Sequence, residues 1–151
     1  MKNENYSISF NTNASAKAAF KNINNVAGWW TKNIEGNTEN VNDVFTVRFG
    51  ETFVTFEITE IIPERKIVWK VTGCNLHWLN NKKEWNNTKV HWLIAKKNNS
   101  TKITMMHEGL IPQIECYTNC EKGWNFYVGE SLRKLINEGQ GLPDTAIAAR
   151  V

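Results

Sequence analysis

The residues best suited to chemistry in this sequence are one histidine and a large set of aromatic side chains. The chain has 151 residues, with seven Trp, seven Phe and three His. His107 shares one face of a predicted strand with Met105. An imidazole with an ordinary pKa of about 6.5 can orient a ligand carbonyl or act as an acid or a base. Aromatic rings around it can form a pocket for an apolar or aromatic ligand.

The candidate ligand-binding residues come from predicted strands, loops and a helix. The set is Trp29, Trp30, Phe49, Phe56, Trp69, Trp78, Trp92, Met105, His107, Trp124 and Tyr127. Two interpretations stay open: a solid core, or a rigid-walled pocket with the three loop tryptophans at its mouth. Tyr127 either offers its hydroxyl to a cavity or spans core and solvent.

His107 also has a purely structural interpretation, as a buried side chain hydrogen-bonded within the wall. Glu108 points to the opposite face of the same strand, so the two residues do not form a dyad. His77 and His91 do not share the face of His107, and the Cys116-x3-Cys120 spacing lacks a second ligand pair. We therefore expect no metal and no cofactor, and catalysis, if there is any, from His107.

One long helix is predicted near the end of the chain, from Thr118 to Gly139. Large side chains recur there at helical spacing, and Thr118 with Glu121 has the spacing of a capping box. Gly139 is suited to a left-handed helix end. At about 1.5 Å per residue this helix crosses a whole small domain.

The strands that support this helix are predicted from alternating apolar residues. They include Tyr6–Phe10, a meander of hairpins between 45 and 108, and a type I turn at 62–65. A short helix at 16–23 follows the first strand, segment 31–42 is predicted as loop or irregular edge, and a long turn is predicted from Gly73 to Asn87. The fold class is α+β, with about six antiparallel strands curved around the C-terminal helix.

Composition favours one domain over residues 1–141, with residues 142–151 as a tail. The net charge is +3 without long basic runs, so neither nucleic acid nor a membrane is an expected partner. The N-terminus lacks the apolar stretch of a signal peptide, and three cysteines without a disulfide framework indicate reduced thiols in the cytoplasm. The sequence is compatible with a monomer or a homodimer.

Five segments in order resemble the family named for the activator homologue of the heat-shock protein 90 ATPase, within the START-like or SRPBCC superfamily. They are Gly28–Trp30, Ile61–Trp69, Trp85–Val90, Thr101–Leu110 and Cys120–Tyr127. The resemblance implies a helix-grip fold, a curved sheet around a long C-terminal helix that often leaves a hydrophobic cavity. The eukaryotic activator has a further N-terminal module for chaperone binding, which is not expected in this chain.

Three functions follow as hypotheses. The first is the binding of a small hydrophobic molecule, such as a lipid, a polyketide or an aromatic metabolite, between sheet and helix. The second, implied by the resemblance, is contact with a chaperone and stimulation of its ATPase. The third is an enzyme similar to the polyketide cyclases or hydrolases of the superfamily, using His107.

Overall fold

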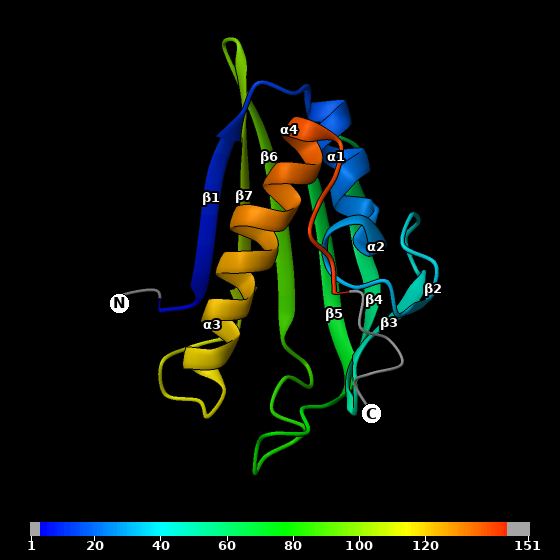
Figure 1. Ribbon diagram of the computed structural model, residues 1–151, viewed down its shortest axis with the longest axis vertical. Helices are drawn as coiled ribbons and strands as arrows, with labels where there is room; N and C mark the ends of the chain where they lie inside the picture. Colours follow the sequence, from blue (N-terminus) through cyan, green and yellow to red (C-terminus); the bar gives the residue numbers. More distant parts are fainter. Residues whose placement is uncertain (1–3, 145–151) are drawn as a thin grey trace.

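A curved antiparallel sheet forms the body of the structure, a computed structural model that describes residues 4–144 (Figure 1). Each strand pairs with its neighbours in antiparallel register. The sheet has seven strands, one more than expected, because a short strand forms inside the predicted irregular edge. In spatial order they are β1 (Tyr6–Thr12), β7 (Ser100–Glu108), β6 (Lys89–Lys97), β5 (Lys66–Asn75), β4 (Thr52–Ile62), β3 (Val44–Phe49) and β2 (Ile34–Gly36).

All helices lie on one face of the sheet (Figure 1). The first pair is α1 (Ala16–Asn24) and α2 (Val26–Trp29), and the C-terminal helix consists of α3 (Tyr117–Phe126), a π-helical stretch η1 (Tyr127–Leu132) and α4 (Arg133–Glu138). The C-terminal helix crosses the sheet diagonally, with its α4 end beside α1. The predicted helix-grip architecture is therefore confirmed.

The strands bury alternate residues against the helices, as the period-2 pattern predicts. In β4, Val54, Phe56 and Ile58 are all buried. Two local predictions are wrong. The turn at 62–65 is of type II, because Glu64 has a φ of 65° after Pro63. Strand β5 also continues to Asn75, so the long connection to β6 begins later than expected.

The start of the long helix differs from the predicted capping box. The helix begins at Tyr117 with Cys116 as the N-cap, and no side chain of the capping residue accepts a hydrogen bond there. The carboxylate of Glu84, from the β5–β6 connection, accepts from the backbone N–H groups of Glu115 and Cys116 instead, at 2.8 and 2.9 Å. The helix ends as predicted, with Gly139 left-handed at a φ of 84°.

A buried serine joins the π-helical stretch to the residues after the helix. The Ser131 hydroxyl donates to the Trp29 carbonyl and accepts from the Leu142 N–H, both at 2.7 Å. Asp144 then forms a parallel bridge with Thr31. The first residues of the predicted tail are thus docked on the domain, while 145–151 lie outside the described residues.

Candidate functional site

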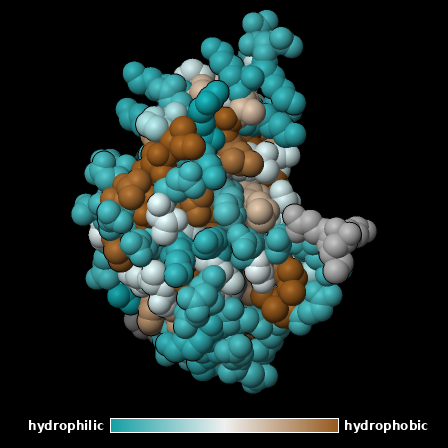
Figure 2. Space-filling model, turned by 180° about the vertical axis from the view of Figure 1, so that it is seen from behind, coloured by the Kyte–Doolittle hydropathy of each residue, from teal (hydrophilic) through white to brown (hydrophobic). Residues whose placement is uncertain are grey.

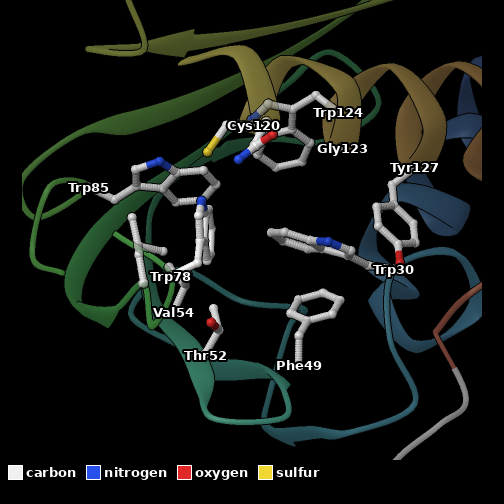
Figure 3. Close-up of a pocket in the computed structure, with 12 residues that line it drawn as sticks. Trp30, Phe49, Thr52, Val54, Trp78, Trp85, Cys120, Gly123, Trp124 and Tyr127 are labelled. Atoms are coloured by element: carbon white, nitrogen blue, oxygen red, sulfur yellow. The ribbon is translucent and has the colours of Figure 1, made fainter. Parts of the chain in front are cut away.

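A cavity of about 310 Å³ lies between the start of the C-terminal helix and one end of the sheet (Figure 3). Its wall comes from the end of α2, the β3–β4 hairpin, the β5–β6 connection, α3 and η1. None of the lining side chains carries a formal charge. They are Trp30, Phe49, Thr52, Val54, Leu76, Trp78, Trp85, Asn119, Cys120, Gly123, Trp124 and Tyr127.

The structure divides the eleven candidate residues into two groups. Five of them line this cavity: Trp30, Phe49, Trp78, Trp124 and Tyr127. The other six are fully buried and take no part in its wall: Trp29, Phe56, Trp69, Trp92, Met105 and His107. Trp29 stacks on Trp69 and meets Trp92 edge-on, so the middle of the sheet carries a solid aromatic core. The aromatic set is thus divided between a packed core and the wall of a cavity. Of the three loop tryptophans expected at a mouth, only Trp78 is exposed, whereas Trp29 is fully buried in the core.

Several residues of the wall are absent from the sequence-based set. Trp85 is the largest of them, and its position in a connection without clear periodicity gave no sign of which way its ring points. Cys120 and Gly123 had a usable signal. Together with Trp124 and Tyr127 they follow the i, i+3, i+4, i+7 spacing of one helix face, so extending that stripe back by one turn finds them.

The indole rings form a continuous wall on the helix side. Trp124 packs against Trp30, with ring centroids 4.9 Å apart, and stacks on Trp85 at 6.0 Å with an interplanar angle of 7°. Trp78 is 48% exposed and stands at the rim of the cavity (Figure 3). The solvent-accessible Trp78 ring therefore lies beside the opening of the cavity, and the packed rings of Trp30, Trp85 and Trp124 form its inner end.

His107 holds this wall together from behind. Its Nδ1 accepts the Trp124 indole N–H at 3.1 Å, so the neutral ring carries its proton on Nε2. That N–H donates to the Thr88 hydroxyl at 2.9 Å, and Thr88 donates in turn to the Trp85 carbonyl at 2.7 Å. The His107 ring also lies edge-on to the Trp85 ring, 4.6 Å away. The hydrogen-bonded chain thus joins the Trp124 indole to the Trp85 backbone, and the edge-on contact of His107 packs against the Trp85 ring.

The electrostatics of His107 suit a structural role. Burial lowers its pKa from 6.5 to about 3, and the nearby His91 adds a smaller effect in the same direction. Both ring nitrogens are hydrogen-bonded to protein groups, and the ring is not part of the cavity wall. Glu108 pairs with His91 at 2.8 Å rather than with His107, as strand parity predicted. No observation on residues 4–144 gives His107 access to a substrate.

Two carboxylates connect the β5–β6 connection to the helix start in a reciprocal way. Glu84 accepts from the backbone at 115 and 116, as described above. Glu115 accepts from the backbone N–H groups of Asn80 and Asn81, at 3.0 to 3.1 Å. These hydrogen bonds lower the pKa of the exposed Glu115 carboxyl. The two segments that carry Trp78, Trp85 and Cys120 therefore form a single unit.

The cysteines correct a prediction. Cys116 and Cys120 are joined by a disulfide across the first turn of α3, and only Cys74 is free and buried. The prediction that all three cysteines are reduced thiols is therefore wrong for Cys116 and Cys120. The spacing of four residues brings the two side chains to the same helix face, with Cα atoms 5.7 Å apart, which is within the range for disulfides.

Two polar groups of the wall have hydrogen-bonding capacity toward a ligand. The Thr52 Oγ1 accepts from the His77 N–H at 3.1 Å, so its own hydrogen can be donated. The Asn119 side chain supplies both a donor and an acceptor.

Within the described part of the chain, no cluster of His, Cys, Asp or Glu is arranged to hold a metal ion. None of the described helices combines the length and the apolar character of a membrane span.

The curved antiparallel sheet and the long C-terminal helix on one of its faces define a helix-grip, START-like fold. Residues 18–137 match the family described as "Activator of Hsp90 ATPase homolog 1-like protein". The match covers most of the chain, and the chain belongs to this family. None of the curated proteins matches the sequence significantly.

Solved structures support the same fold. The Aha1 dimer from Colwellia psychrerythraea is 21% identical with a TM-score of 0.76, over 91% of this chain and 98% of that one. DynU16, from the dynemicin biosynthetic locus, is 14% identical with a TM-score of 0.71, over 93% of this chain and 49% of that one. CalU16 from Micromonospora echinospora is 10% identical with a TM-score of 0.63, over 86% and 73%.

Proposed function

We propose that this protein binds a small, uncharged, apolar molecule with aromatic character in the cavity described above. The observation that carries the proposal is the composition of the wall, in which six of twelve lining residues are aromatic and none is ionised. Burial of apolar surface at about 25 cal/mol per Å² then supplies most of the affinity. The rigid packing of the rings lowers the entropic cost of ordering the site on binding.

The size of the cavity narrows the ligand class. A volume of about 310 Å³ is near the lower limit for pockets that hold drug-sized ligands. A compact molecule of two or three fused rings fits such a space, whereas a long-chain lipid has to leave part of its chain outside. Among the classes considered, an aromatic metabolite or a short polyketide is therefore favoured over a lipid.

Orientation is assigned to the polar groups of the wall. The Thr52 hydroxyl can donate to a carbonyl or phenol oxygen of the ligand, and Asn119 lies among the lining residues on the helix side. His107 was a candidate for this role, but its two nitrogens are committed to Trp124 and Thr88. It contributes by holding the wall rather than by touching the ligand.

A fluorescent-dye displacement assay tests the proposal. Anilinonaphthalene sulfonate is bound to the purified protein and displaced by a panel of bicyclic and tricyclic aromatic ketones and phenols. We expect Trp78→Ala to weaken binding at least several-fold, since it removes a large ring from the rim. Leu93→Ala is the matched control, because Leu93 is a similarly exposed apolar residue, 46% exposed, in β6 and outside the cavity.

Two outcomes would contradict the proposal. One is the absence of any displacing compound across the whole panel. The other is an equal effect of Trp78→Ala and Leu93→Ala, which would mean that the dye reports general surface hydrophobicity.

A second candidate function is contact with an ATP-driven chaperone. It is favoured by membership of the family named for activators of such an ATPase. This function predicts a rise in ATP turnover by the host's heat-shock protein 90 when the domain is added. Unchanged ATP turnover at a large excess of the domain would rule out this second function.

A further inference from the structure

The two bridged cysteines differ in their access to the cavity. Cys120 belongs to the cavity wall and is 8% exposed, whereas Cys116 is fully buried behind it. Figure 3 shows the Cys120 sulfur on the side of α3 that faces Trp85. A small nucleophile inside the cavity can therefore reach the Cys120 sulfur, while the protein covers the other sulfur of the bridge.

The buried sulfur is placed to leave as a thiolate. The Trp85 indole N–H donates to the Cys116 Sγ at 3.1 Å, and this hydrogen bond strengthens when the sulfur becomes negative. Cys116 is also the N-cap of the ten-residue helix α3, whose positive end favours a thiolate. The Glu84 carboxylate opposes this effect: it accepts from the Cys116 N–H at 2.9 Å, so its negative charge lies near the sulfur and disfavours the thiolate.

We infer that the Cys116–Cys120 pair is a thiol–disulfide exchange site for low-molecular-weight thiols that enter through the cavity. The thiolate of the incoming molecule attacks the Cys120 Sγ, forms a new S–S bond to it, and breaks the bond between the two protein sulfurs. The electron pair of the broken bond stays on the Cys116 Sγ, which becomes the thiolate beside Trp85. The product is a mixed disulfide on Cys120, and a second thiol or the return of Cys116 releases it.

This inference is compatible with a reducing compartment. Disulfides that occur there are usually transient and catalytic or redox-sensing, whereas buried structural ones are typical of secreted proteins. Exchange at Cys120 would place a covalent adduct inside the aromatic cavity. The site uses the same cavity as the proposed function but needs no affinity for an apolar ligand, so the two can fail separately.

The test uses the full chain in its oxidised form with 2-mercaptoethanol as the probe. Brief exposure to a limiting amount of the thiol is stopped with iodoacetamide, and the modified residues are located by peptide mass spectrometry. We expect the mixed disulfide on Cys120 and the carbamidomethyl group on Cys116. Cys74 is an internal control that stays unmodified, since burial raises the pKa of its thiol. A mixed disulfide on Cys116, or exchange only in denaturant, would overturn the inference.

Two substitutions near the leaving sulfur test the mechanism by rate. Trp85→Phe keeps a ring but removes the N–H donor, and we expect exchange to slow about tenfold. Glu84→Gln removes the opposing charge and is expected to accelerate exchange several-fold. Rates that change in the same direction for both variants, with unfolding midpoints close to wild type, would refute the role given to Cys116. Dye binding measured on Cys116→Ser, which removes the bridge at a residue outside the cavity wall, reports separately on the proposed apolar-ligand function.

Discussion

The burial of His107 predicts how the stability of this protein depends on pH. In the folded state burial lowers the pKa of His107 to about 3, against 6.5 for the exposed side chain. Between these two values the unfolded chain binds a proton that the folded chain does not. Stability contributed by the neutral ring is therefore complete above pH 6.5 and is lost as the pH falls from 6.5 toward 3.

The size of the effect follows from the pKa difference. At about 1.36 kcal/mol per pH unit, lowering the pH from 7.5 to 5.0 removes about 2 kcal/mol of unfolding free energy through His107 alone. His107→Gln is the matched variant, because its amide has an acceptor for Trp124 and a donor for Thr88 but no proton to gain. Urea unfolding of both proteins at the two pH values isolates the contribution of the imidazole.

The expected result is a wild-type loss that exceeds the loss of His107→Gln by about 2 kcal/mol. His107→Leu completes the series: it leaves the Trp124 indole N–H without an acceptor, at a cost of about 1–3 kcal/mol at pH 7.5. In a Trp124→Phe background that cost should largely disappear. Equal pH dependence in wild type and His107→Gln, or a histidine NMR titration of His107 near pH 6.5, would refute the reasoning.

Three further substitutions test the local geometry. Gly123→Ala should stabilise the helix by about 0.5–1 kcal/mol, because the added methyl group meets no neighbour. Gly141→Ala should destabilise the fold, because its methyl group would lie 2.4 Å from the Gly28 carbonyl oxygen. Thermal unfolding of both variants and of the wild type measures the two effects. Glu115→Gln should flatten the acid limb of the stability curve, because hydrogen bonds depress the pKa of the wild-type carboxyl and their contribution is lost as the pH falls through that lowered value. An unchanged acid limb would contradict the hydrogen-bonding role of Glu115.

The fold was predictable from the sequence because each strand has one buried face. Alternation of apolar residues fixes which side chains point inward, and this gave the position of β4 and the burial of Met105 and His107. The long helix was found in the same way, from its 3.6-residue stripe. Its end at Gly139 depends on one local residue and was also correct.

Two features of the long helix that the sequence did not predict depend on distant partners. The helix N-terminus is capped by Glu84, which lies 31 residues before Glu115 in the chain, so no local pattern shows it. The π-helical stretch contains buried Ser131, whose hydroxyl bonds to backbone groups of Trp29 and Leu142 outside the helix. The sequence pattern there is that of an ordinary helix.

The division of the aromatic residues into core and cavity has a physical reason that strand parity cannot supply. Every inward ring faces the helices, but helix α2 inserts Trp29 against Trp69 and Trp92 in the middle of the sheet. Beyond Trp30, the next cover is the β5–β6 connection, which meets the helix start through carboxylate-to-backbone contacts. Contacts of that kind hold two segments together without filling the space beneath them, so the cavity forms where the β5–β6 connection and the start of the C-terminal helix together cover the end of the sheet.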